Sequence, residues 1–154
     1  MKSLLKISDA VSIGLHALVL MASRPGDVLS AAGIAGSLGV SRHHLVKVLQ
    51  RLDRAGLVTS ERGPAGGYRT AVDPGAISLL RVIEALEGKV QPAGCLLRRP
   101  ICGGRCLVGE LLEMVNNQLL PYFSSVTIAD LADSLKHRSA PVRRKGKTVK
   151  GGEF

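Results

Sequence analysis

The chain has 154 residues, of which 45% are hydrophobic, and this suits one compact domain with a real core. It carries 21 Lys and Arg residues against 12 Asp and Glu residues, a net charge of +9. No apolar run approaches the roughly 18 residues that a membrane helix needs, and Met1–Asp9 lacks a long apolar signal core, so we expect a cytoplasmic protein without membrane attachment.

The first predicted helix runs to about Met21. Its apolar residues recur three or four positions apart, and Ser8 or Asp9 can cap it. A turn follows at Arg24–Asp27, because Pro and Gly both interrupt a helix. His16 lies within an apolar face of this helix, where we expect a packed histidine rather than a metal ligand.

Two further helices are predicted over Ala31–Leu38 and Arg42–Arg54, separated by a turn at Gly39. Ser30 and Ser41 are expected to cap them. The second of the two helices has a stripe of apolar residues to bury: Leu45, Val48, Leu49 and Leu52. A helix, a turn containing glycine and another helix together predict a helix-turn-helix.

The other face of Arg42–Arg54 is polar and mostly basic. It consists of Arg42, His43, His44, Lys47, Gln50, Arg51 and Arg54. The major groove of DNA accepts one helix, whose N-terminal side chains face the base edges. The first four of these residues are therefore candidates for base contact, whereas Arg51 can reach a phosphate or the first helix. Every surface helix has a polar face, but this one follows a helix-turn-helix turn and precedes a hairpin, which favours DNA contact.

Two short β-prone runs, 57–62 and 68–72, flank a tip of glycine and proline and predict a β-hairpin. After a helix-turn-helix, such a hairpin reads as a wing. Glycines let a tip approach a phosphate backbone, and an arginine at its base can enter a narrow minor groove. An ordinary hairpin would carry the same glycines. The candidate DNA-contacting residues of the wing are Arg62, Gly63, Gly66, Gly67, Tyr68 and Arg69.

The remaining elements are helical. Asp73-Pro74 opens a fourth helix that is expected to end at Gly88. A long helix, Leu107–Leu120, follows the loop after it and carries an apolar stripe suited to pairing with another helix, and Pro121 is expected to end or kink it. Thr127 then caps a last short helix, Ile128–Leu135.

The loop between the fourth and the long helix holds the three cysteines of the chain, Cys95, Cys102 and Cys106. In a reducing compartment, clustered cysteines are more often metal ligands or redox sensors than disulfides. Thiolates suit iron–sulfur clusters or zinc. Three nearby cations favour the thiolate form: Arg98, Arg99 and Arg105. The residues themselves leave open an iron–sulfur cluster, a zinc site, or redox-active thiols without a metal.

The string from Leu52 to Tyr68, LDRAGLVTSERGPAGGY, resembles the winged-helix transcription regulators of the Rrf2 family. This family includes iron–sulfur regulators of the IscR type and nitric-oxide-sensitive repressors of the NsrR type. The similarity extends over about residues 2–135, including Ile77–Gly88, the cysteine loop, the long helix and Thr127–Leu131. The wing motif Arg-Gly-Pro-x-Gly-Gly-Tyr after a helix-turn-helix is its specific signature.

The resemblance implies a homodimer, paired through Leu107–Leu120, on a pseudo-palindromic promoter site in double-stranded DNA. It implies that Ser41 to Lys47 enter the major groove and that Arg62 reaches the minor groove. It also implies a 2Fe–2S or 4Fe–4S cluster on the three cysteines, with a fourth ligand that is not cysteine. Such a cluster gates DNA affinity in response to nitric oxide, redox state or iron–sulfur supply.

Two features of this chain differ from the family's pattern. Six residues separate the first two cysteines and three separate the last two, whereas the family's commoner spacing is C-x5-C-x5-C. Gly109 stands where IscR-type members have a histidine ligand. NsrR-type members instead use an aspartate near the N-terminus, from the partner subunit, and Asp9 is the candidate for that role here. Helix capping is the alternative role for Asp9, and Glu110 is a weaker ligand candidate.

The expected fold is mainly α with a small β-hairpin wing: a winged helix-turn-helix plus a long dimerisation helix. We expect a DNA-binding domain (1–88), a cysteine loop (89–106), the dimerisation helix with a C-terminal helix (107–135) and a basic tail (136–154). The tail holds seven Lys or Arg residues and one Glu, a net +6, and its composition predicts disorder. It can attract phosphates without specificity, or it can be a solvated tail with no specific role.

Two rival functions differ from a cluster-gated regulator. A regulator of the same fold could use zinc or bare thiol chemistry without an iron–sulfur cluster. An enzyme is not expected, because the sequence shows no Ser/His/Asp set, no phosphate-binding loop and no paired acid and base carboxylates.

Overall fold

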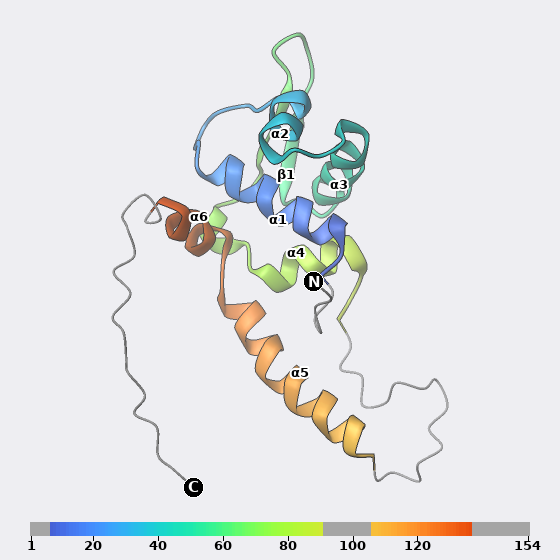
Figure 1. Cartoon of the computed structure of the whole chain (residues 1–154). Helices are drawn as coiled ribbons and strands as arrows, with labels where there is room; N and C mark the ends of the chain where they lie inside the picture. The colour runs from blue at the N-terminus through green and yellow to red at the C-terminus, as the bar shows by residue number, and fades with distance from the viewer. Residues whose placement is uncertain (1–6, 91–105, 137–154) are drawn as a thin grey trace, which may run out of the picture.

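The computed structural model describes residues 7–90 and 106–136. These residues form helices and one two-stranded antiparallel sheet, as expected for a winged helix-turn-helix with a long additional helix (Figure 1). The elements are α1 (Asp9–Ala22), α2 (Ala31–Leu38), α3 (Arg42–Arg54), β1 (Val58–Glu61), β2 (Gly67–Thr70), the 3-10 turn η1 (Pro74–Ala76), α4 (Leu79–Glu87), α5 (Leu107–Ser125) and α6 (Ile128–Lys136). No helix in these two ranges is long and apolar enough to cross a membrane.

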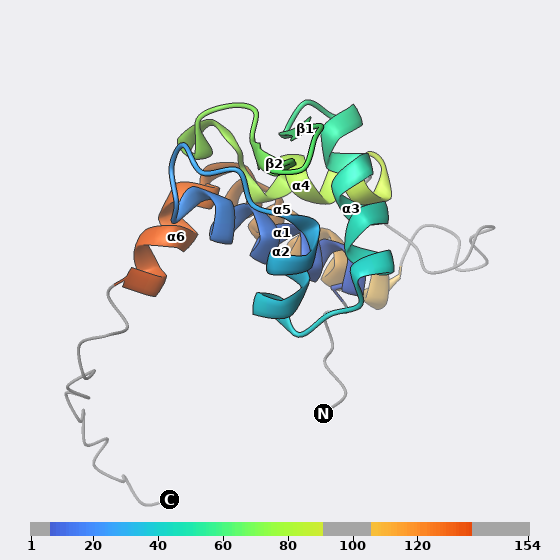
Figure 2. The same ribbon diagram turned by 90° about the horizontal axis from the view of Figure 1, so that it is seen from above.

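Helix α1 is the centre of the core. It packs against α3, α4 and α6, and Figure 2 shows α3 and α6 on opposite sides of it. Gly14 permits the close approach of α4, because a Cβ atom there would lie 2.6 Å from Leu86 Cδ1. Among residues 7–90 and 106–135, every buried side chain larger than glycine is apolar. The core therefore depends on shape and hydrophobic burial rather than on internal polar pairs.

The helix boundaries in the first half follow the predicted caps, with one exception. Ser8 Oγ accepts a hydrogen bond from Val11 N at 3.2 Å, and Ser30 Oγ accepts one from Gly33 N at 3.1 Å. Gly39 ends α2 with φ of 66°, a left-handed conformation that favours glycine. Ser41 occupies the cap position of α3 but makes no capping hydrogen bond with its side chain, so that expected role was wrong.

The wing is a β-hairpin that is also tied to the chain before α2. Val58 pairs with Thr70 at one end of the ladder and Glu61 with Gly67 at the other. Leu29 and Tyr68 exchange two backbone hydrogen bonds of 2.9 Å, which adds a third strand-like segment beside β2. A Cβ atom at Gly67 would overlap the carbonyl oxygen of Leu29. This glycine is therefore required by the fold itself.

The fourth helix does not begin at Asp73-Pro74 as predicted. The turn η1 is followed by an extended residue, Ile77, and α4 begins only at Leu79. The interruption arises because this segment pairs with the chain before α6: Leu79 N donates to Val126 O, and Ile128 N donates to Ile77 O, each at 2.9 Å. These long-range hydrogen bonds replace helical ones.

Helix α5 continues past Pro121 to Ser125, so its predicted end near Leu120 was wrong. Proline removes one helical N–H and crowds the preceding turn. The last turn survives because Phe123 and Val126 pack against the core, and Ser124 Oγ donates to Leu120 O at 2.8 Å. Tertiary packing outweighs the local cost of the proline.

Thr127 caps α6 as predicted, and Asp130 completes a reciprocal cap that was not predicted from the sequence. The backbone N–H and the hydroxyl of Thr127 both donate to Asp130 Oδ2, at 2.8 and 2.7 Å. Asp130 N in turn donates to Thr127 Oγ1 at 3.3 Å. The hydroxyl and the backbone N–H of Thr127 hold the pKa of Asp130 below its ordinary value of 3.8, because both hydrogen bonds favour the ionised carboxylate.

We expect Asp130→Asn to lower the melting temperature at neutral pH, with a difference that shrinks as the solution is acidified. The folded-state pKa of Asp130 is depressed, so its carboxylate stabilises the protein above the unfolded-state pKa. That contribution is lost as the pH falls through the folded-state pKa. Thermal unfolding followed by circular dichroism between about pH 7 and pH 3 measures it. Asp27→Asn, in an exposed turn, is the control, and wild-type and Asp130→Asn curves that run parallel at all pH values would contradict the prediction.

Candidate nucleic-acid interface and cysteine region

Helix α3 presents the predicted basic face to solvent. Its apolar stripe, Leu45, Val48, Leu49 and Leu52, is buried in the core. The predicted polar residues on the other face are exposed, apart from His44, which is half-buried: Arg42, His43, Lys47, Gln50, Arg51 and Arg54. Ser41 is exposed at the start of the helix. The structure thus brings together all the predicted candidates for major-groove contact on one helix.

The charge around α3 favours the binding of a polyanion. The first turn has no acidic residue, and the N-terminal end of a helix itself carries a partial positive charge that attracts phosphates. The only acidic residue of α3 is Asp53, and its carboxylate accepts a hydrogen bond from Ser60 Oγ at 3.3 Å. This bond joins the end of α3 to β1 and keeps the acid at the opposite end from the candidate base-contacting residues.

The wing holds two arginines in different situations. Arg62 is exposed where the tip begins. Arg69 Nε instead lies 2.7 Å from Glu61 Oε1 across the hairpin, with about half of each side chain exposed. The Arg69 side chain is therefore already engaged in an ion pair within the wing. Figure 1 shows the wing projecting above α3, while α5 extends from the opposite end of the body.

The remaining wing candidates have structural roles that the sequence left open. Gly63 has φ of 121°, which favours glycine. A Cβ atom at Gly66 would overlap the carbonyl oxygen of Glu61, and Gly67 is required beside Leu29. Tyr68 is half-buried and packs against the core. The fold explains these four residues without any reference to DNA.

The start of α1 lies beside the start of α3, a proximity that no local sequence pattern predicts. Asp9, Ser41 and His44 line one shallow hollow. Ser8, not Asp9, makes the capping hydrogen bond of α1, and the Asp9 side chain is exposed in the first turn. His16 was expected to be packed in the core, but it is exposed, and its Nδ1 atom lies 2.7 Å from Ser12 O. The predicted burial of His16 was wrong, because exposure of a polar imidazole ring to solvent costs little free energy.

Cys106 occupies the N-cap position of α5. Its Sγ atom accepts a hydrogen bond from Gly109 N at 3.3 Å, and the residue is half-buried. Gly109, which stands where a histidine ligand was looked for, is buried in the first turn and supplies that N–H. Glu110 is exposed. Cys95 and Cys102 lie outside the described residues, and within the described ranges no group of three His, Cys, Asp or Glu residues could hold a metal ion.

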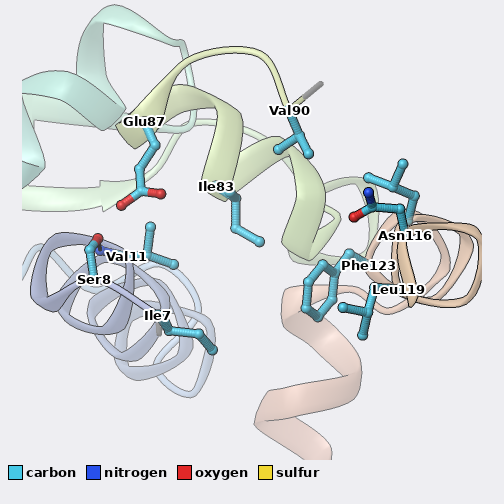
Figure 3. Close-up of a pocket in the computed structure, with 10 residues that line it drawn as sticks. Ile7, Ser8, Val11, Ile83, Glu87, Val90, Asn116, Leu119 and Phe123 are labelled. Carbon is cyan, nitrogen blue, oxygen red and sulfur yellow. Dashed lines mark hydrogen bonds between the residues drawn. The ribbon is translucent and has the colours of Figure 1, made fainter. Parts of the chain in front are cut away.

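An apolar groove of about 200 Å³ lies between α1, α4 and α5. Figure 3 shows Ile83, Leu119 and Phe123 around a space that Ile7 and Val11 face from the side of α1. Val90, which lies in the cysteine loop and is the last residue described before position 91, also lines it. The Val90 N–H donates to Glu84 Oε1 at 3.3 Å, which holds the start of the cysteine loop against α4.

The outer face of α5 is apolar and exposed. Leu107 is 85% exposed, Leu111 53% and Met114 54%. These residues are four and three positions apart, so they lie on one face of the helix. Exposed apolar patches are characteristic of contact surfaces in proteins.

Comparison with known proteins identifies the family. A model of the Rrf2 family, described as an iron-dependent transcriptional regulator, matches residues 7–134. The HTH-type transcriptional regulator IscR of Vibrio cholerae is 35% identical over 101 residues, which are 65% of this chain and 58% of that protein. The chain spans just over half the length of the curated relatives it matches.

Two solved structures share the fold closely. CymR, the global cysteine regulator of B. subtilis, is 30% identical with a TM-score of 0.75, covering 85% of this chain and 98% of its own. IscR of T. potens is 28% identical with a TM-score of 0.73, covering 88% and 92%. Because the family model spans the winged helix-turn-helix, α5 and α6, the chain belongs to the Rrf2 family of transcriptional regulators.

Proposed function

We propose that this protein is a cytoplasmic, homodimeric DNA-binding transcription regulator whose DNA affinity is gated by an iron–sulfur cluster. The observation that carries the proposal is the exposed basic face of α3 beside the wing, in a chain of the Rrf2 family. The cluster, of the 2Fe–2S or 4Fe–4S type, is assigned to Cys95, Cys102 and Cys106. The signal is nitric oxide, redox state or iron–sulfur supply.

In this proposal α3 enters the major groove of a pseudo-palindromic promoter site. Arg42, His43, His44 and Lys47 face base edges, and Arg51 reaches a phosphate. The hydroxyl of Ser41 makes no capping bond, which leaves it available to DNA. In the wing, Arg62 enters the minor groove. Gly63, Gly66, Gly67, Tyr68 and Arg69 shape and flank the tip, and Glu61 holds the Arg69 side chain in place.

We expect Arg42→Ala to weaken binding to a duplex that the wild-type protein has selected from a random pool. Loss of a base contact costs about 1–3 kcal/mol, and the preference at one base position should relax. Fluorescence anisotropy at fixed salt measures both effects. Arg81→Ala removes the same charge from an exposed position on α4 and should have no effect. Equal affinities for Arg42→Ala and wild type would contradict the assignment.

The position of Cys106 fits a thiolate ligand. Its sulfur lies at the N-terminal end of α5, where the helix dipole and the Gly109 N–H stabilise negative charge on sulfur. Hydrogen bonds to ligand sulfurs also tune bound clusters. An iron–sulfur cluster would supply a centre that can change charge or be lost, and Cys106 would transmit that change directly to the first turn of α5.

The proposed gating of DNA affinity rests on the position of the cysteine loop, which connects α4 to α5. The loop begins at Val90, held by Glu84 at the end of α4, and ends at Cys106, where α5 begins. A cluster on the loop would fix the start of the proposed dimer helix relative to the body that carries α3. A difference of a few kcal/mol between the two states changes DNA occupancy by about a hundredfold.

The fourth ligand is assigned to Asp9 of the partner subunit. Figure 1 shows the start of α1 well separated from the start of α5 within one subunit, which favours a ligand from the partner subunit. Asp9 shares a hollow with Ser41 and His44. A ligand bond to Asp9 would therefore act beside the first turn of the recognition helix.

The two roles of Cys106, helix cap and ligand, are separated by one substitution. We expect Cys106→Ser to remove iron, sulfide and visible absorption from the anaerobically purified protein, while helix content stays unchanged. Serine is one of the strongest N-caps, so the cap is kept while the thiolate is lost. Cys106→Ala should lose both. Metal analysis, absorption spectra and circular dichroism make the measurement.

Cluster retention by Cys106→Ser would remove this cysteine from the ligand set. A colourless wild-type protein that contains zinc or no metal would favour the alternative, a regulator of the same fold that uses zinc or bare thiols. A specific observation supports that alternative, because the solved relatives include a cysteine regulator as well as an IscR. Identical operator footprints with and without the cluster, at matched salt, would contradict gating.

The exposed apolar face of α5 supports the dimer. In this proposal Leu107, Leu111 and Met114 of each subunit pack against the partner. Burying a leucine side chain contributes about 1.5–3 kcal/mol. A contact of this kind holds the two α3 helices at a fixed spacing, which a pseudo-palindromic site requires.

We expect Leu111→Glu to be monomeric in sedimentation equilibrium and to bind the selected duplex more weakly, because a buried, unpaired carboxylate opposes the contact. Leu135→Glu makes the same substitution at an equally exposed leucine on α6 and should stay dimeric. A monomeric wild-type protein, or a dimeric Leu111→Glu, would contradict the assignment of α5.

A further inference from the structure

The ion pair between Glu61 and Arg69 follows from a position in the hairpin that has no side chain. Glu61 lies directly opposite Gly67 in the β ladder, and Arg69 lies opposite Thr59. Position 67 must be glycine because a Cβ atom there would overlap the carbonyl oxygen of Leu29. Glu61 therefore has no directly opposite side chain to contact, and it reaches its diagonal neighbour, Arg69, within 2.7 Å.

The pair lies on the face of the wing that is turned away from the core. Side chains alternate between the two faces of a strand. Ser60 and Tyr68 pair with each other on the inner face, where Ser60 Oγ donates to Asp53 of α3 and Tyr68 packs against the core. Their neighbours Glu61 and Arg69 therefore occupy the outer face, and 43% and 50% of their side chains are exposed.

A carboxylate is an unexpected group at this place. In the proposed complex the wing approaches DNA phosphates, which repel a negative charge, and Glu61 directly precedes Arg62 at the tip. Within the described part of the wing, Arg62 makes no ion pair, whereas Arg69 does. The contact with Arg69 indicates that Glu61 acts on DNA binding through that arginine.

We propose that Glu61 is a positioning residue for DNA binding, which holds the Arg69 guanidinium so that its remaining N–H donors bind a backbone phosphate beside the wing. The inference rests on the proposed function, because it assumes that the tip of the wing enters the minor groove. Arg69 is two residues from Gly67 at the end of the ladder, about 7 Å along the strand. The minor groove is about 7.5 Å deep, so a tip inserted into it leaves Arg69 near the phosphates that line its rim.

The shape of the guanidinium permits both contacts at once. The group has more N–H donors than one carboxylate can accept, and the contact with Glu61 uses Nε, on its side. The terminal nitrogens keep donors for the two-pronged contact that suits a phosphate. An arginine side chain that is already held also loses less conformational freedom when it binds. This gain opposes the repulsion between the Glu61 carboxylate and the phosphates.

The test is the affinity for the selected duplex, measured by fluorescence anisotropy over a series of salt concentrations. We expect Glu61→Ala to weaken binding about threefold, because the arginine loses its orientation. Arg69→Ala should weaken binding about tenfold and reduce the slope of log K against log salt by about 0.9, the value for one phosphate contact. In the Arg69→Ala background, Glu61→Ala should instead tighten binding, because the carboxylate then only repels DNA.

Three controls separate orientation from charge and from folding. Arg69→Lys keeps a cation without the planar fork, so Glu61→Ala should no longer weaken binding in that background. Glu87→Ala removes an exposed acidic charge from α4 and should leave the affinity unchanged. All variants should unfold close to the wild-type melting temperature, because an exposed ion pair contributes little to stability.

Tighter binding by Glu61→Ala in the wild-type background would overturn the proposal, because Glu61 would then only repel DNA. So would an unchanged affinity of Glu61→Ala, or an unchanged salt slope for Arg69→Ala. Failure of the proposed function gives a different result, since a wild-type protein that binds no duplex would overturn both. Where Arg42→Ala weakens binding and the Glu61 and Arg69 variants behave as wild type, only the inference about the wing fails.

Discussion

The packing of α3 against α1 is the constraint on which the rest of the molecule depends. Leu45, Leu49 and Leu52 are fully buried there, and burial of each leucine contributes about 1.5–3 kcal/mol. A helix that buries one stripe cannot rotate about its own axis without exposing it. The same contacts that stabilise the core therefore fix the direction in which Arg42 and Lys47 project.

Local signals in the sequence predicted the first half of the fold well. Ser8, Ser30 and Gly39 act within a few residues of themselves, so their effects can be read from the neighbouring sequence. The break before α4 and the continuation of α5 past Pro121 depend on contacts with distant segments. Helix propensities describe local sequence, so they cannot predict the long-range hydrogen bond between Ile128 and Ile77.

The same division applies to the candidate site. The polar face of α3 follows from helical periodicity, and the structure confirms that its predicted residues are exposed, apart from the half-buried His44, while their contact with DNA stays a prediction. The pairing of Arg69 with Glu61 and the closeness of Asp9 to His44 depend on how the wing and α1 are placed. Cys106 illustrates a further limit, since a pattern of cysteines indicates a ligand but does not reveal that the same sulfur begins a helix.

The two hydrogen bonds between Leu29 and Tyr68 have a consequence for the choice of DNA sequence. They attach the wing to the chain that enters α2, so the wing and the helix-turn-helix form a single rigid unit. When a rigid protein unit binds DNA, the DNA has to change its shape to fit the protein. In the proposed complex, with Arg62 in the minor groove, sequences whose minor groove is already narrow at the distance set by the wing would need the least bending energy, and discrimination would extend to base pairs that no side chain touches.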